Sequence, residues 1–134
     1  MKSLSPVTKW LALSIVFIQA FHSIEEYLGE LWENLPPARF LCSLISDDLE
    51  KGFLIINIGL FIFGILGWLL VVRTSHFLAK PFISFWIFIE IANGFMHPIW
   101  VIIQDSYRPG VITAPFLLLN AIFLLKFYRK DISS

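Results

Sequence analysis

One stretch near the N-terminus carries residue types that bind metals or move protons. It reads His22-Ser23-Ile24-Glu25-Glu26, and it follows an apolar run. On a helix, residues three or four positions apart share one face, so the imidazole and both carboxylates point the same way. Gln19 lies one turn before them on that face. The pattern predicts a polar face on an otherwise apolar helix.

A second polar stripe lies inside the apolar segment 82–103. Glu90, Asn93 and His97 follow one another at intervals of three and four residues, which again places them on one helix face. An ionisable group inside a membrane span costs on the order of 3 kcal/mol, so it is rare unless it faces other helices and serves a ligand, a pathway or a partner. Glu90 is the clearest case in this sequence.

Two neutral imidazoles and one carboxylate form the ligand set of a catalytic zinc site or of a non-haem iron site. Both kinds of site leave a coordination position open for water or substrate. We therefore expect His22 and His97 to bind a divalent metal, zinc or iron, with Glu25 or Glu26 as the third ligand. We assign Glu25 as that ligand and Glu26 as a general base for the metal-bound water.

The loop 104–110 would complete such a site. Tyr107 and Arg108 offer an O–H and a guanidinium that could hold an anionic headgroup or an oxyanion. These residues together predict a metal-dependent membrane enzyme whose lipidic substrate enters from the outer leaflet.

Two other functions fit the same residues. In a small proton-coupled transporter, Glu90 or Glu25 would alternate between a proton and a cationic substrate, and so short a chain would form a homo-oligomer to enclose a path. In a structural or accessory subunit, the polar groups would only fix helix packing through interhelical hydrogen bonds. Stoichiometric metal that is lost in a His22→Ala variant would separate the enzyme from both alternatives.

Three motifs in this order and spacing are similar to those of a known family. The chain resembles, over nearly its whole length, the bacterial HXXEE domain family of small multi-span membrane proteins, which is named for the first motif. The family has no known function, so the resemblance marks positions of interest without giving them a role. The motifs are His22-Ser23-Ile24-Glu25-Glu26, Asn93-Gly94-Phe95-Met96-His97 and Tyr107-Arg108-Pro109-Gly110-Val111-Ile112-Thr113.

The composition requires a solvent other than water. Of the 134 residues, 57% are hydrophobic and only 15% are charged, whereas ordinary soluble domains have about 25% charged residues. The net charge is zero, so the sequence has no surplus of lysine and arginine to neutralise phosphates, and we expect no nucleic-acid partner. We expect the chain to lie among membrane lipids.

Four apolar segments predict an all-α integral membrane four-helix bundle with short loops. About 20 residues, at a rise of 1.5 Å each, cross a hydrocarbon core of about 30 Å. We expect spans at about 10–28, 52–72, 82–103 and 111–127, in a single domain of residues 1–134. The first segment has no small-x-small cleavage site after it, so we expect an uncleaved helix rather than a signal peptide.

Lysine and arginine predict the orientation, because cytoplasmic segments carry the excess. Seven of the ten basic residues lie near the two termini and in the loop 73–81, and three lie on the other side. Both termini should therefore be cytoplasmic, in a chain that crosses the bacterial inner membrane several times. The seven are Lys2, Lys9, Arg73, Lys80, Lys126, Arg129 and Lys130, and the three are Arg39, Lys51 and Arg108.

Depth decides whether the two polar stripes can meet. Both histidine-bearing helices run outward, which places His22 about 18 Å and His97 about 22 Å from the cytoplasmic boundary. Asn57 enters from the outer side and reaches nearly the same level. If both imidazoles bind one metal, bonds of about 2.0 to 2.1 Å bring their nitrogens within about 4 Å of each other, and a separation above about 10 Å would exclude a shared metal. A separation of roughly 6 Å, with Glu25 or Asn93 between the rings, would instead favour a hydrogen-bonded network without metal.

Overall fold

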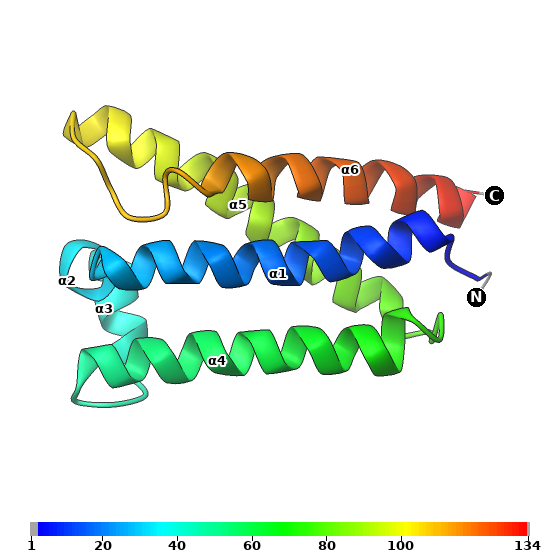
Figure 1. The fold of residues 1–134 in the computed structure, drawn as a ribbon, viewed down its shortest axis with the longest axis horizontal. Helices are drawn as coiled ribbons and strands as arrows, with labels where there is room; N and C mark the ends of the chain where they lie inside the picture. Colours follow the sequence, from blue (N-terminus) through cyan, green and yellow to red (C-terminus); the bar gives the residue numbers. More distant parts are fainter. Residues whose placement is uncertain (1–2, 134) are drawn as a thin grey trace.

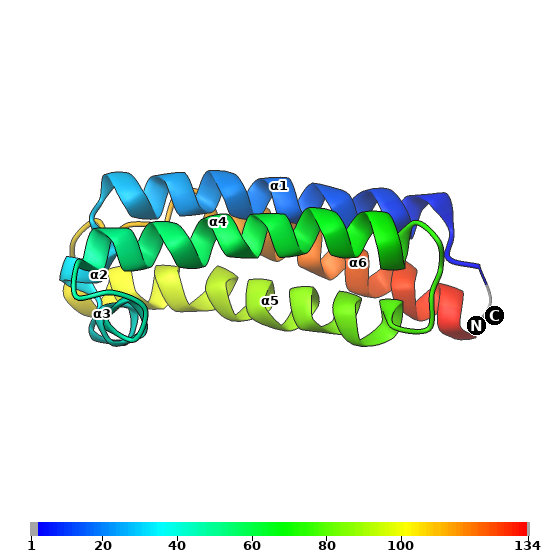
Figure 2. The ribbon, with the colours of Figure 1, turned by 90° about the horizontal axis from the view of Figure 1, so that it is seen from below.

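The computed structural model describes residues 3–133, and this part of the chain is all-helical. A π-helix, η1 (Trp68–Val72), continues α4 without a break. The long helices α1, α4, α5 and α6 lie side by side, and the short helices α2 and α3 lie at one end (Figure 1, Figure 2). The α-helices are α1 (Pro6–Leu28), α2 (Leu31–Asn34), α3 (Pro36–Ser43), α4 (Leu49–Gly67), α5 (Ala79–Gln104) and α6 (Ala114–Ser133).

Three helices are long and apolar enough to cross a membrane, namely Pro6–Leu28, Leu49–Val72 and Ala79–Gln104. They contain the first three expected spans and extend each of them by a few residues. The expected fourth span, 111–127, overlaps α6, which begins three residues later and continues into a charged segment after Leu125. The helices thus indicate a membrane protein.

Proline and serine determine where the helices begin. Ser5 caps α1 by accepting a hydrogen bond from the Thr8 amide at 3.3 Å, and Pro6 follows at the first helical position, where a missing N–H breaks no hydrogen bond. This cap explains why α1 begins four residues before the apolar run. Pro36 starts α3 in the same way, so the segment after α1 folds into two short helices.

The packing brings the C-terminal halves of α1 and α5 together. α1 lies between α4 and α6, and α5 contacts α6, η1 and α1. Figure 1 shows that α5 runs obliquely behind α1, from the η1 end toward the far end of the molecule. The oblique course places polar side chains of α5 against the polar face of α1.

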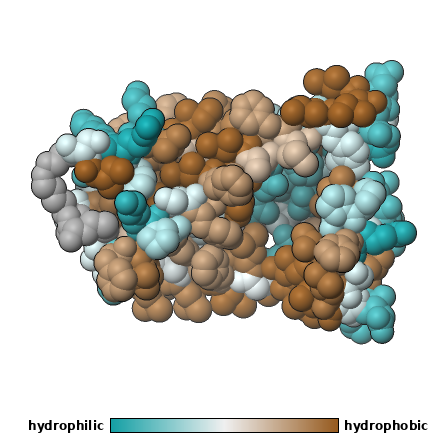
Figure 3. All heavy atoms as spheres, turned by 180° about the vertical axis from the view of Figure 1, so that it is seen from behind, coloured by the Kyte–Doolittle hydropathy of each residue, from teal (hydrophilic) through white to brown (hydrophobic). Residues whose placement is uncertain are grey.

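The core lies between α1, η1, α5 and α6, while the outside of the long helices is apolar. α4 buries only Gly52, Phe53 and Gly64. In Figure 3 the middle of the molecule is mostly hydrophobic, and hydrophilic residues gather at its two ends. Such a belt of exposed apolar side chains suits contact with lipid. The largest fully buried apolar side chains are Trp86, Ile15, Ile83, Leu117, Leu124, Val16 and Val72.

Asp131 of α6 fastens the start of α1. Its Oδ2 accepts hydrogen bonds from the Ser5 amide at 2.9 Å, from Ser5 Oγ at 2.9 Å and from Thr8 Oγ1 at 2.6 Å. Burial acts to raise the pKa of Asp131, but these hydrogen bonds outweigh it and lower the pKa below its ordinary value. Ser5, Thr8 and Asp131 form what we call the terminal clasp, which places the start of α1 beside the end of α6.

Candidate metal centre

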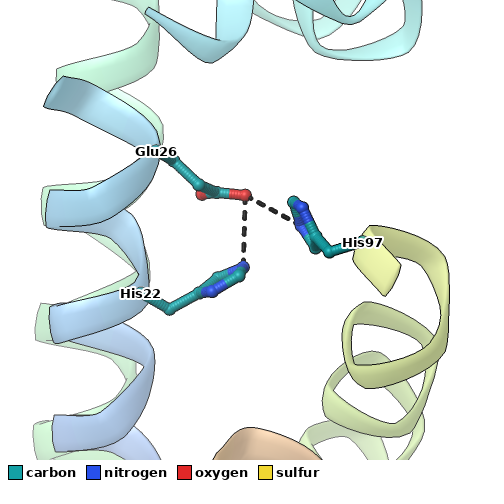
Figure 4. Close-up of side chains that lie close together, drawn as sticks. All are labelled: His22, Glu26 and His97. Atoms are coloured by element: carbon teal, nitrogen blue, oxygen red, sulfur yellow. Dashed lines mark ion pairs between the residues drawn. The ribbon is translucent and has the colours of Figure 1, made fainter. Parts of the chain in front are cut away.

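Two imidazoles and one carboxylate meet between α1 and α5. Figure 4 shows His22 and Glu26 of α1 facing His97 of α5. Glu26 Oε1 lies 3.3 Å from Nε2 of His22 and 3.3 Å from Nε2 of His97. Two ligands of a tetrahedral zinc with bonds of 2.0 to 2.1 Å are separated by about 3.4 Å, so both carboxylate–imidazole distances match that spacing. We call these three residues the triad.

The two histidines meet as the depth argument requires. Their ring centroids are 4.7 Å apart, with the planes at 84°, and the ligand atoms of the triad all lie within 4.8 Å of one another. The structure therefore brings His22 and His97 together. This upper bound is wider than the expected spacing of about 4 Å and well below the separation of about 10 Å that would exclude a shared metal.

The triad is buried, which raises the cost of any uncompensated charge. The exposed fractions are 0% for His22, 5% for His97 and 8% for Glu26. Within residues 3–133, no lysine or arginine forms an ion pair with Glu26. A buried carboxylate needs a positive partner. For an ionised Glu26 that partner is either a proton on an imidazole or a cation held by all three side chains, whereas a protonated Glu26 would donate to an imidazole nitrogen.

Thr113 orients the ring of His22. Its Oγ1 lies 2.7 Å from Nδ1 of His22 and donates its single hydrogen to Glu25 Oε2 at 2.5 Å. With that hydrogen on the carboxylate, the strongest acceptor in reach, Nδ1 of His22 is the donor to Thr113. In neutral His22 the lone pair is then on Nε2, which faces the Glu26 carboxylate. A metal-binding histidine has this arrangement, with its other nitrogen donating to a fixed acceptor.

Glu25 lies against the loop 105–113 instead of between the imidazoles. Glu26 follows His22 by four residues and lies directly above it, whereas the neighbouring position is turned by about 100° toward α6. The geometry therefore places Glu26, and not the expected Glu25, beside the imidazoles, while Glu25 organises the loop. The carboxylate of Glu25 accepts hydrogen bonds from Tyr107 Oη at 2.9 Å, the Ile112 amide at 3.0 Å, the Thr113 amide at 2.9 Å and Thr113 Oγ1.

Tyr107 and Arg108 lie at the rim rather than on the triad. Burial and the hydrogen bond to Glu25 raise the pKa of Tyr107 to about 12, so it remains a neutral donor at ordinary pH. The guanidinium of Arg108 lies 5.4 Å from the Trp100 ring centroid and donates to Gln104 at 3.0 Å. Trp100 in turn lies 6.3 Å from the His97 ring. The Trp100 ring thus connects Arg108 to His97 of the triad.

Gly110 allows the loop to close over the two imidazoles. A Cβ at this position would lie 2.5 Å from Cε1 of His97 and 2.7 Å from Cε1 of His22. Its φ of +95° lies in the region that favours glycine. Residue reasoning gave Thr113 no role, and only the family resemblance marked it.

The other expected polar residues form a separate group, which we call the Glu90 network. Glu90 is fully buried, accepts a hydrogen bond from Asn93 at 3.1 Å, and has one side-chain amide atom of Gln19 3.0 Å from both of its oxygens. If Glu90 is ionised, the Gln19 amide nitrogen faces it and donates. If Glu90 is protonated, the Gln19 amide oxygen faces it and accepts. Ser23, 3.2 Å from Gln19, donates to Asn57 at 2.7 Å. The network thus links α5 through α1 to α4.

Comparison with known proteins gives a family but no function. The sequence model of a family described as "Protein of unknown function with HXXEE motif" matches residues 10–125. No curated protein and no protein of solved structure matches the chain. The matched range contains the whole triad and the loop that closes over it.

Proposed function

The chain belongs to the HXXEE family of proteins of unknown function, and we propose that this member is a metal-dependent integral membrane enzyme acting on a lipidic substrate. The triad would hold one divalent metal, zinc or iron. In this proposal α6 is the fourth span of a four-helix bundle in the bacterial inner membrane, with both termini cytoplasmic.

One observation gives the main support for a metal at the triad. A single oxygen of Glu26 lies 3.3 Å from Nε2 of both His22 and His97, at the separation of ligands around a tetrahedral ion. The hydrogen bond between Nδ1 of His22 and Thr113 supports it, because it leaves the lone pair of a neutral ring directed at the carboxylate. Two imidazoles and one carboxylate leave coordination positions for water or a substrate oxygen, which the metal would activate as a Lewis acid.

A groove on the lipid-facing side supports an apolar substrate. It lies between α1 and α4, has a volume of about 290 Å³ and is lined mainly by apolar side chains. Ser23 and Asn57 supply its polar groups, and Ser23 is the neighbour of His22 on α1. A lipid tail in this groove would place a polar headgroup near the end where Tyr107 and Arg108 lie.

Metal analysis of the detergent-purified protein tests the proposal. We expect about one zinc or iron per wild-type chain, and we expect it to be lost in His22→Ala, His97→Ala and Glu26→Gln, since each variant removes one of three ligands. His76→Ala is the matched control, because His76 lies in the exposed loop after η1. Metal-free wild-type protein after loading with zinc and with ferrous iron, or triad variants that bind as wild type does, would contradict the proposal.

The Glu90 network favours a second candidate, a proton-coupled transporter working as a homo-oligomer. Glu90→Gln should then abolish proton movement driven by a lipophilic cation such as tetraphenylphosphonium in proteoliposomes. If the network only fixes helix packing, the same variant should be silent or mildly stabilising, because it removes an ionisable group from the membrane.

A further inference from the structure

A second groove lies between α5 and α6 and is separate from the triad. It has a volume of about 600 Å³, and its long walls are apolar. From Lys80 to Phe95 it follows α5 for fifteen residues, or about 22 Å, which exceeds the depth of one leaflet of about 15 Å. The apolar lining is formed mainly by Ile87, Phe88, Ile91, Phe95, Leu125 and Ile132.

Two basic residues stand at one end of this groove. Lys80 begins α5 and Arg129 lies near the end of α6, at the same end of the molecule as the terminal clasp. Both are exposed, and among the described residues neither side chain has a hydrogen bond or an ion pair. The end of the groove therefore carries two positive charges that no described residue pairs with.

Tyr128 adds a buried donor to the same groove. The residue is only 4% exposed, and its hydroxyl, which is buried, has no hydrogen-bond partner in residues 3–133. A buried hydroxyl without a partner is costly, so its position in the wall of a groove points to a ligand oxygen that accepts from it.

We propose that this groove binds one anionic phospholipid. The phosphate contacts Lys80 and Arg129, an acyl chain lies along the apolar walls of α5 and α6, and the Tyr128 hydroxyl donates to a phosphate or ester oxygen. Arginine and lysine are the usual partners of phosphate, and a headgroup of net negative charge offsets positive charge at this end of the groove, which a zwitterionic headgroup does not. If both termini are cytoplasmic, the lipid comes from the inner leaflet, where anionic headgroups attract basic side chains.

Binding of fluorescent phosphatidylglycerol to the detergent-purified chain, with phosphatidylcholine of the same acyl length as reference, tests the site. We expect tighter binding of phosphatidylglycerol, and an apparent Kd that rises by about tenfold or more in Lys80→Gln/Arg129→Gln. Tyr128→Phe should weaken binding by a smaller factor without changing the charge. Glycerol phosphate, which has no acyl chain, should not compete.

The control is Arg73→Gln/Lys126→Gln, which removes the same charge from the same end of the molecule but lies outside the groove. Equal loss of binding in both double variants would mean general surface attraction and would overturn the proposal. So would equal affinity for the two lipids, or a groove variant that changes the oligomeric state but not lipid binding. Metal content should be normal in all of these variants, so the result is independent of the triad.

Discussion

Among single residues, Thr113 has the most specific task, because it fixes which nitrogen of His22 is protonated. Thr113→Val keeps the shape of the side chain but removes the hydroxyl that accepts from Nδ1. We expect zinc affinity to fall by about 10- to 100-fold, the usual effect of losing a partner behind a ligating histidine. Competition with a fluorescent zinc chelator measures the change.

Thr113→Ser is the matched control for that prediction. Serine retains the hydroxyl, so its affinity for zinc should stay near that of the wild type while the methyl group is lost. If the serine and valine variants weaken zinc binding equally, packing of the side chain rather than its hydrogen bond to His22 positions the ring.

Sequence reasoning located the histidines but not their carboxylate. The rise per residue predicted only that His22 and His97 lie at nearly the same level, and the packing of α1 against α5 brings them together. The choice between Glu25 and Glu26 depends on the rotation of α1 about its axis, and two adjacent residues differ by about 100°. That rotation is determined by packing against α4 and α6, which the hydrophobic pattern does not resolve.

For whole helices, the apolar runs predicted the positions of the helices well but predicted their ends poorly. Hydropathy marks where a chain lies in lipid, whereas capping residues and water decide where a helix begins and ends. α1 begins earlier than expected because of Ser5 and Pro6, and α6 continues to Ser133 because a helix remains stable where it leaves the apolar layer. The clasp residue Asp131 lies beyond the expected span and was not expected to have a role.

The clasp between α1 and α6 makes a prediction for stability. Asp131→Ala leaves the Thr8 hydroxyl, which is fully buried, without its acceptor, so we expect a loss of about 1 to 2 kcal/mol at neutral pH. Thermal unfolding in detergent, followed by circular dichroism, measures it. Asp47→Ala, a change at an exposed loop residue, should have little effect.

The same variant should show a pH dependence of defined sign. The pKa of Asp131 is lowered in the folded state, so its contribution is fully present above the unfolded value of about 3.9 and is lost as pH falls through the folded value. The difference in Tm between wild type and Asp131→Ala should therefore be constant near neutral pH and shrink below about pH 4. A difference that persists unchanged at pH 2 would mean that the ionised carboxylate is not what holds α1.

In the molecule as a whole, the position of both chain ends predicts the topology. The clasp places the start of α1 and the end of α6 at one end, and α2 and α3 lie at the other (Figure 1). We expect reporter tags at both termini to be cytoplasmic, and a cysteine at Asp47, in a Cys42→Ser background, to react with an impermeant reagent from outside. If the cysteine at position 47 reacts only from the cytoplasm, the orientation is opposite to the one expected. If the two tags lie on opposite sides, α6 does not cross the membrane.

The arrangement of the whole molecule depended on features that a sequence read alone does not contain. The oblique course of α5 and the closure of the loop 105–113 over the triad come from contacts between distant segments. The hydrophobic pattern predicted four apolar segments, of which three form helices long and apolar enough to cross a membrane, but it did not show that one loop would close over the triad.

The terminal clasp also has a consequence for synthesis. Thr8 and Asp131 are 123 positions apart, and a chain made from its N-terminus meets Thr8 long before Asp131 exists. Until α6 has been translated and has docked, the hydroxyl at the start of α1 lacks the acceptor it has in the finished molecule. Closure of the clasp therefore follows the synthesis of α6, and a product that ends before Asp131 lacks the carboxylate that holds the start of α1.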